Sequence, residues 1–477
     1  MYKRIIYNYI LGIAIAMSFG ACTAPSLVDK AANTNVPASY MGSKDTTNIA
    51  AIKWQDYFKD PYLIALIDSA LLHNQELNIT LQEIAISRNE IKSRKGEYLP
   101  FVGLRSGMGF DKVGRFTRNG ALEANTDIAP GKEFPEPLSD FAFGAYASWE
   151  LDVWHKLRNA KKAALSRYLS SIEGKNFMVT NLIAEIANAY FELLALDSQL
   201  EILNRNIEIQ KNAFEIVKLQ KEAARVTELA VRKFEAEVLG TQSLQFDIGQ
   251  RIIETENRIN FLVGRFPAPV ERTLSPFDEL IPQVIHEGVP SQLLLNRTDI
   301  KRAEMNLVSA RLDVKVARAR FYPSLGLSAG LGFQAFSLSK LIKAPQSMLY
   351  SMAGELSGPL INKRAIKAAF STANAKQIKA VYSFDQTVLN AYIEVANQLS
   401  MIDNLEKSYA LRNGQVEALT KSVNIANKLF SSARADYMEV LLTQRDALES
   451  KFELIEIKRK QMSAMVNVYQ ALGGGWK

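Results

Sequence analysis

The sequence has one cysteine, Cys22, and three histidines among its 477 residues. One cysteine cannot form a disulfide framework or a zinc cluster within the chain, and His73, His155 and His286 do not stand at ligand spacing from one another. The sequence also lacks a glycine-rich phosphate loop and a nucleophile elbow. We therefore expect neither an enzyme nor a bound metal or cofactor.

Charge is not concentrated at any point of the chain. The net charge is +7, and Lys and Arg alternate with Glu in stretches such as "EIQKNAFEIVKLQKEAAR". Such stretches are typical of solvated helix faces, and no platform of aromatic and basic residues accompanies them. Nucleic acid is therefore not an expected partner.

The N-terminus predicts an export signal. Lys3 and Arg4 precede the apolar stretch "IIYNYILGIAIAM", which is short for a spanning helix, and small residues lead to Cys22. This ending resembles a bacterial lipobox, in which cleavage leaves the cysteine lipidated. We expect a lipoprotein signal peptide at 1–21 and a lipidated, extended linker at 22–50. An ordinary signal with an incidental cysteine is the alternative.

The rest of the chain reads as two copies of one plan. The stretch "EIKSRKGEYLPFVGLRSGMGF" (90–110) aligns with "DVKVARARFYPSLGLSAGLGF" (313–333), and apolar heptads recur at 193–217 and 402–430. The following domains are predicted: a first repeat at 51–265, a proline-rich connector at 266–290, a second repeat at 291–472 and a C-terminal tail at 473–477.

Each copy is predicted to contain two strands and two long helices. The predicted strands span about 98–112, 139–153, 321–335 and 347–357, and the predicted long helices about 155–223, 228–264, 360–431 and 436–472. No proline interrupts 154–222 or 361–431. Such helices would each reach roughly 100 Å, longer than a globular domain is wide, so we expect an extended coiled-coil bundle.

The strands alternate apolar residues with small or polar ones. Strands of about ten residues, tilted near 45°, cross the roughly 25 Å apolar height of an outer membrane. Arg105, Glu150 and Asp152 on the small-residue face are expected to meet water. Aromatic residues near the strand ends suit the membrane interface; they are Tyr98, Trp149, Trp154, Phe321 and Tyr322.

Four strands cannot close around a lumen, since spanning barrels begin at about eight strands. The chain is therefore expected to supply part of a barrel wall to an oligomer. Two, three or four copies would each satisfy this requirement. A soluble four-stranded sheet packed on helices is the alternative.

Four blocks, at 54–77, 289–327, 435–448 and 466–476, resemble the TolC-like outer-membrane factors, specifically the lipoprotein branch that serves RND-type multidrug efflux pumps. The resemblance implies a mainly α fold with a small β part, four transmembrane β-strands per chain and a long coiled-coil α-barrel. It implies a homotrimer with a twelve-stranded β-barrel among outer-membrane lipid and a large periplasmic extension. The loops at about 112–139 and 336–347 would face outside.

The resemblance also implies partners and function. A periplasmic adaptor and an inner-membrane RND-type pump would pass drugs or other small molecules to this exit duct. The alternatives are a duct for type I protein secretion or for metal or siderophore export, and a periplasmic coiled-coil scaffold without a pore. The four alternating strands disfavour the scaffold, which needs none.

Two periplasmic regions follow from the resemblance. The adaptor would contact two helical turns; their residues are Ala224, Arg225, Val226 and Thr227, and Ala433, Arg434, Ala435 and Asp436. A periplasmic gate would comprise Met438, Glu439, Leu442 and Arg445. The alternative is that the gate residues belong to an ordinary coiled-coil surface and seam.

Three positions in these two periplasmic regions depart from the family's pattern. Ala224 and Ala433 stand where the family usually has glycine, and alanine disfavours a positive φ, so we expect a different turn geometry or adaptor specificity. Leu442 replaces a commonly acidic position, which favours a more apolar seal.

Overall fold

The computed structural model describes Pro25, residues 30–40, 47–273, Phe277, Leu280 and residues 286–359, 361–432 and 434–476. Cys22, the predicted signal peptide at 1–21 and Ala433 lie outside the described residues. The chain forms two compact units. The first contains residues 85–168 and 305–381, and the second contains residues 32–84, 169–304 and 382–477. Each unit therefore combines segments from both halves of the sequence.

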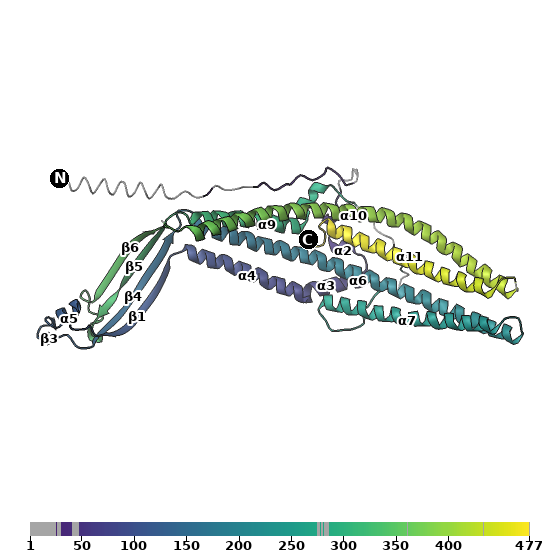
Figure 1. Ribbon diagram of the computed structural model, residues 1–477, viewed down its shortest axis with the longest axis horizontal. Helices are drawn as coiled ribbons and strands as arrows, with labels where there is room; N and C mark the ends of the chain where they lie inside the picture. Colours follow the sequence, from purple (N-terminus) through teal and green to yellow (C-terminus); the bar gives the residue numbers. More distant parts are fainter. Residues whose placement is uncertain are drawn as a thin grey trace. The chain divides into compact units, whose positions relative to one another are not determined.

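Long helices account for most of the chain (Figure 1). The α-helices are α2 (Trp54–Tyr57), α3 (Pro61–His73), α4 (Gln75–Tyr98), α5 (Arg118–Glu123), α6 (Lys156–Glu222), α7 (Glu228–Val263), α8 (Leu293–Asn296), α9 (Thr298–Ala319), α10 (Arg364–Ser431) and α11 (Tyr437–Ala471). The strands are β1 (Phe101–Asp111), β2 (Asp127–Ala129), β3 (Lys132–Glu133), β4 (Leu138–Leu151), β5 (Ser324–Ala335) and β6 (Met348–Ser357). The predicted fold class, mainly α with a small β part, is confirmed.

The first unit contains an antiparallel sheet in the order β1-β4-β5-β6. Directly paired residues of antiparallel strands share a face. The register joins Leu104 to Ala145, Ala145 to Leu331 and Leu331 to Tyr350, so a row of apolar side chains crosses all four strands. Within the chain β1 and β6 each pair on one side only.

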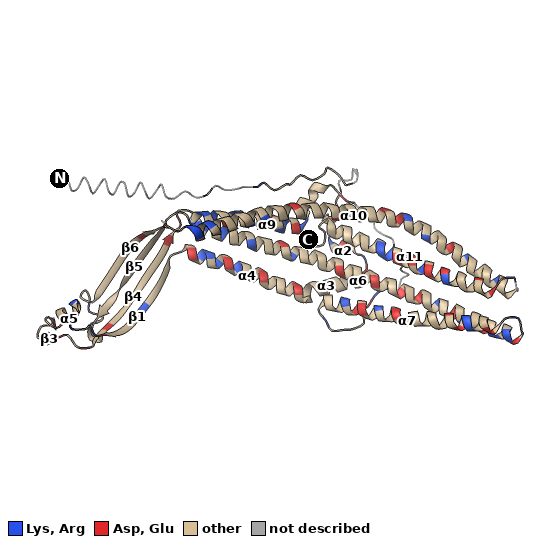
Figure 2. Cartoon of the chain, viewed as in Figure 1, with Lys and Arg blue, Asp and Glu red and all other residues tan. Residues whose placement is uncertain are grey.

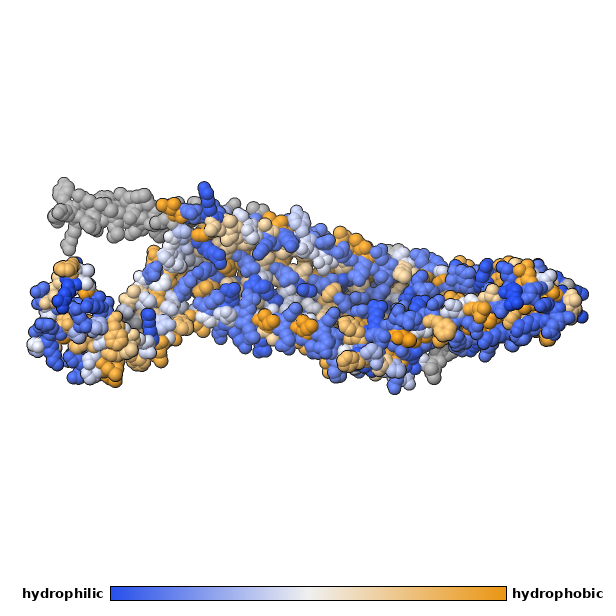
Figure 3. All heavy atoms as spheres, turned by 60° about the horizontal axis from the view of Figure 1, so that its bottom comes forward, coloured by the Kyte–Doolittle hydropathy of each residue, from blue (hydrophilic) through white to orange (hydrophobic). Residues whose placement is uncertain are grey.

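The apolar face extends along the whole sheet. It comprises Val102, Leu104, Met108 and Phe110 of β1, Phe141, Phe143, Ala145, Ala147, Trp149 and Leu151 of β4, Leu325, Leu327, Ala329, Leu331, Phe333 and Ala335 of β5, and Met348, Tyr350, Met352 and Leu356 of β6. Leu104 is 75% exposed and Met352 81%. Figure 3 shows apolar side chains at the surface over these strands, beside a more hydrophilic part around α5 and β3. A face of this kind is not what a water-soluble sheet leaves uncovered.

Two residues that were expected at the surface of the sheet, Asp152 and Phe321, are buried instead. Asp152 follows the end of β4, where its carboxylate accepts hydrogen bonds from the backbone N–H of Leu157 and of Arg158, both at 2.9 Å. The Asp152 carboxylate can be buried because these backbone N–H groups, which lack partners within the first turn of α6, donate to it. Phe321 is 1% exposed and packs edge-on against Phe370, so it belongs to a small core rather than to a membrane interface.

Other aromatic residues at the strand ends do carry polar contacts. Trp149 donates its indole N–H to the carbonyl of Tyr98 at 3.1 Å, and Trp154 donates to the carbonyl of Pro323 at 2.7 Å while stacking on Tyr322. Exposed rings with one satisfied polar atom suit the boundary between apolar and wet surroundings.

The second unit has a large aromatic and aliphatic core. Tyr57 stacks on Tyr469 with ring centroids 4.2 Å apart, and its hydroxyl donates to the carbonyl of Met465 at 3.0 Å. Arg272 crosses between α6 and α7, donating to Asp197 at 2.5 Å and to Glu256 at 2.6 Å. These contacts join segments that are far apart in the sequence.

The linker predicted at 22–50 is not a free tether over its whole length. The N–H of Asn33 donates to Asp385 of α10 at 2.8 Å, and Tyr40, 1% exposed, stacks on Tyr392 with centroids 5.5 Å apart. The buried ring of Tyr40 gives this segment an apolar contact with α10, although most of the residues around it in the sequence are small or polar.

The two sets of heptads differ in burial. Leu193, Leu203 and Val217 of α6 are fully buried, whereas Tyr409, Val416 and Val423 of α10 remain partly exposed. α6 also contains a stretch apolar enough to cross a membrane, but 78% of that stretch is buried inside the chain, as expected of a core helix.

Candidate functional site

The first helical turn joins α6 to α7 through a left-handed residue. Ala224 has φ 54°, the N–H of Arg225 donates to the carbonyl of Gln220 at 2.8 Å, and the N–H of Ala224 donates to that of Lys221 at 2.8 Å. These two bonds define a Schellman motif, whose left-handed position usually holds glycine. Ala224 itself adopts this left-handed position. That the two alanines change the turn geometry or the adaptor specificity stays a prediction.

The second turn joins α10 to α11. The N–H of Arg434 donates to the carbonyl of Leu429 at 2.9 Å, the counterpart of the long-range bond in the first turn. Thr227 and Asp436 occupy equivalent positions, as the N-cap residues of α7 and α11. Both have extended backbones without a side-chain capping bond, so their polar groups remain available at the surface.

One small core holds the two turns together; we call it the turn core. Val217 of α6, Phe234 of α7, Phe430 of α10 and Val440 of α11 belong to it, as does Val226 in the first turn. The rings of Phe234 and Phe430 lie 6.4 Å apart. The two helical hairpins therefore end in one packed structure.

Charged residues surround the first turn (Figure 2). Glu228 forms ion pairs with Lys221 and with Arg232, and Arg232 also meets Glu235 at 2.8 Å. The hydrogen bond from Lys221 lowers the pKa of Glu228. These groups are exposed, so the pairs add little stability, but they fix a pattern of charge that a partner can recognise.

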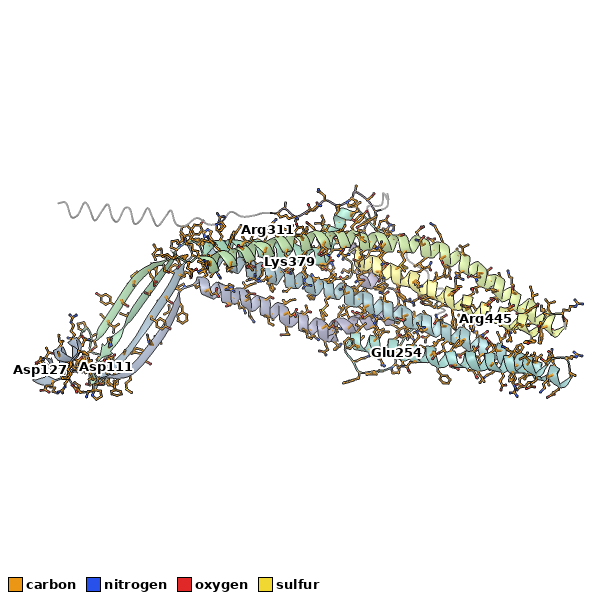
Figure 4. All side chains as sticks on the ribbon, viewed as in Figure 1. Asp111, Asp127, Glu254, Arg311, Lys379 and Arg445 are labelled. Carbon is orange, nitrogen blue, oxygen red and sulfur yellow. The ribbon has the colours of Figure 1, made fainter. Side chains whose placement is uncertain are left out.

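The gate residues share one face of α11. Met438, Glu439, Leu442 and Arg445 are exposed, whereas neighbours such as Val440 are buried against the rest of the chain. Met438, Leu442 and Arg445 stand four and three residues apart and so lie on successive turns, and Glu439 stands three residues before Leu442 (Figure 4 labels Arg445). The face is thus unpartnered within the chain.

Sequence reasoning missed one charged neighbour on this face. Asp446 follows Arg445, and its carboxylate lies 3.6 Å from the guanidinium. Both side chains are more than half exposed, so the pair is weak. The position of Asp446 directly after Arg445 in the sequence was the one feature that could have predicted this pair.

The second face of the sheet is lined mainly by small, hydroxyl-bearing and charged residues, with Phe101, Leu138 and Leu349 as its large apolar members. Glu150, Gly326 and Glu355 form one row, with Glu150 paired to Lys156. A cavity of about 630 Å³ lies over this end of the face, and Ser148, Ser328 and both glutamates are among its lining residues. This face can border water while the opposite face borders lipid.

A metal centre is not apparent in the described parts of the chain. They contain no group of three or more His, Cys, Asp or Glu side chains placed to hold a metal ion. The functional candidates are therefore surfaces: the two turns, the gate face of α11 and the two faces of the sheet.

The chain is similar to known proteins over most of its length. The family described as "Outer membrane efflux protein" matches residues 66–265 and 289–474. The pyoverdine export outer membrane protein OpmQ of Pseudomonas aeruginosa is 25% identical, over 98% of this chain and 96% of that protein. The probable outer membrane lipoprotein SilC of Salmonella typhimurium is 24% identical, over 92% and 93% respectively.

A solved structure shares the fold. The open state of the MtrE outer membrane channel of Neisseria gonorrhoeae superposes with a TM-score of 0.82, over 95% of this chain and 98% of that chain, at 22% identity. The family and such neighbours are channel proteins, not enzymes.

Proposed function

Because the chain belongs to the outer membrane efflux protein family and is an outer-membrane exit duct for efflux, we propose that it works as a homotrimer. Three copies of the four-stranded sheet would close a twelve-stranded barrel, and the long helices would continue the passage into the periplasm. The observation that carries the proposal is the sheet itself, with one apolar face and two open edges.

Open edges and an apolar face require closure by other copies. In lipid, the unpaired N–H and C=O groups of β1 and β6 would each cost several kcal/mol. Pairing β6 of one copy with β1 of the next satisfies both edges at once. Two copies would give eight strands and three would give twelve, and the family resemblance favours three.

The helices of the second unit support the same assembly. Leu239, Phe246 and Ile253 of α7 recur every seven residues and are 60%, 78% and 52% exposed. An apolar heptad stripe of this kind is a coiled-coil seam that lacks its partner. We assign a second copy of this chain to it, because the same closure that completes the barrel brings copies side by side.

The periplasmic end would carry the adaptor contacts and the gate. We propose that the adaptor contacts Ala224–Thr227 and the equivalent residues Ala433–Asp436. We propose further that the exposed face of α11 faces the axis, where three copies of Glu439 would form an acidic ring. Leu442 would add an apolar ring and Arg445 a basic one. An inner-membrane RND-type pump would supply the energy.

The lipid anchor is part of this proposal. Cleavage before Cys22 would leave a lipidated N-terminus in the outer membrane. The packing of Asn33 and Tyr40 on α10 supports a role for the linker in holding the helices near the anchor. One relative, SilC, is itself named as an outer membrane lipoprotein.

The cargo would be drugs or other small molecules, with selection made mainly by the pump. Siderophore export is the second candidate, because OpmQ is named for pyoverdine export. Susceptibility of a deletion strain to drugs, measured beside siderophore release, separates the two. Sensitisation without loss of release supports the first candidate, and the reverse supports the second.

Native mass spectrometry of the detergent-solubilised protein tests the assembly. We expect three copies for the wild type and a smaller species for Phe246→Glu, which places a charge in the seam. Gln245→Glu is the matched control, since it adds the same charge to the exposed neighbour and should remain trimeric. A monomeric wild type would contradict the proposal, and an intact Phe246→Glu trimer would contradict the assignment of the α7 stripe.

A further inference from the structure

Arg105 is the only basic residue in the four strands of the large sheet, all of which the structure describes. It lies on the face opposite the apolar one, and its row across the sheet runs through Gly144 and Gly332 to Leu349. The two residues next to Arg105 in this row are therefore both glycine.

Because Gly144 and Gly332 have no side chains, only backbone lies beside Arg105 on β4 and β5 in this row. A Cβ on Gly332 would lie 2.5 Å from the carbonyl oxygen of Phe143, and one on Gly144 would lie 2.8 Å from that of Leu331. Neither distance admits a side chain, so close approach of the β4 and β5 backbones requires glycine at both positions. The guanidinium therefore has no neighbouring side chain on β4 or β5 in its own row.

Arg105 is also electrically isolated. It forms no ion pair or side-chain hydrogen bond with the residues that the structure describes, and it is exposed. The acidic residues of this face are Asp111, Asp140, Glu150 and Glu355. Along their strands, each lies four or six residues from the row of Arg105, a backbone separation of about 13 or 20 Å at 3.3 Å per residue. These separations exceed the Debye length of about 8 Å at physiological salt. Asp140 also accepts hydrogen bonds from Gln334, the shorter at 2.8 Å.

We propose that Arg105 is a specificity-determining residue of the strand wall, which raises the local concentration of anionic solutes and lowers that of cationic ones. This inference rests on the proposed duct, in which three copies place three Arg105 side chains at one height of the lumen. The ligand class is any small solute with a carboxylate, sulfonate or phosphate group.

The local electrostatic potential can be measured by the rates at which charged thiol reagents, added from the outer side, modify a nearby cysteine. Gly107→Cys places a reporter two residues from Arg105 on the same face, about 7 Å away, where a Cβ has open space. The only native cysteine, Cys22, serves as the blank in the unsubstituted chain. The probes are sulfonatoethyl methanethiosulfonate, which is anionic, and trimethylammonioethyl methanethiosulfonate, which is cationic.

We expect the ratio of anionic to cationic modification rates to fall about twofold when Arg105→Gln is added, from one charge at about 7 Å in screened water. Arg105→Lys should retain the ratio. Ser328→Cys, on the same face but about 13 Å further along, should be insensitive to Arg105→Gln. An unchanged ratio at Gly107→Cys would overturn the proposal.

Two further measurements, one at high salt and one with a cysteine on the apolar face, distinguish failure of the Arg105 proposal from failure of the proposed duct. Molar salt should abolish the charge preference in the Gly107→Cys protein with Arg105 intact. This measurement tests the proposal even if Arg105→Gln does not assemble. Persistence of the preference in molar salt would overturn the proposal. Leu331→Cys, on the apolar face, should resist both reagents. If it reacts as fast as Gly107→Cys, the proposed duct itself is wrong. If only Gly107→Cys reacts, without charge preference, the duct stands and the role of Arg105 falls.

Discussion

Ala224→Gly should stabilise the first helical turn. A residue with a Cβ costs about 1–2 kcal/mol in the left-handed region, and Ala224 adopts φ 54° there. Glycine removes that cost but loses about 0.4–1 kcal/mol more conformational entropy on ordering. The net expectation is about 0.5–1 kcal/mol in favour of glycine, which lowers the opening equilibrium of the turn roughly two- to fivefold.

The matched control is the neighbouring Ala223→Gly. Ala223 donates its N–H to the carbonyl of Leu219 at 3.1 Å, as a residue of the last helical turn does, and lacks a positive φ. Glycine there should destabilise the helix end by up to about 1 kcal/mol. The two substitutions are chemically identical and adjacent, yet their effects should have opposite signs.

Hydrogen–deuterium exchange of peptides that cover 218–226 measures both effects. The informative amide is that of Arg225, which donates to Gln220 across the turn. Exchange should slow in Ala224→Gly and quicken in Ala223→Gly. Equal changes of the same sign in both variants would refute the argument that backbone strain at Ala224 limits the turn.

Two further predictions concern the sheet and the core. Gly332→Ala should prevent assembly of a heat-resistant oligomer on gels, because its Cβ would meet the Phe143 carbonyl, whereas Gly107→Ala should assemble normally; normal assembly of Gly332→Ala would contradict the close strand approach. Burial raises the pKa of Tyr57 and Tyr469 above their ordinary value. Unfolded tyrosines ionise near pH 10 while the folded ones stay protonated, so stability should fall as pH rises above about 10. Circular dichroism should show alkaline unfolding that begins later in Tyr57→Phe, and a pH-independent signal to pH 12 would contradict this.

Local sequence patterns predicted much of the architecture. The alternation of Leu325, Leu327 and Leu331 with small residues predicted the two faces of β5, because side chains of a strand alternate by geometry alone. The uninterrupted helical periods of α6 and α10 likewise needed no tertiary information.

Features that depend on long-range pairing were not visible in the sequence. Asp152 continues the alternation of β4 but caps α6, since the donors at a helix start compete for its carboxylate. The stretch without side chains beside Arg105 arises only when Gly144 and Gly332 are paired, and 188 positions separate them in the sequence. Tyr40 docks on Tyr392 across a still longer interval. Such contacts follow from topology rather than from any local period.

Single-channel conductance in planar bilayers tests the central claim most directly. Purified protein should insert as discrete conducting units, and replacement of Glu439 and Arg445 by alanine should enlarge the conductance by loosening the gate face of α11. The measurement addresses the passage without reference to cargo, adaptor or pump. Absence of conductance from both the wild type and the double variant, with protein present in the bilayer, would contradict a transmembrane duct.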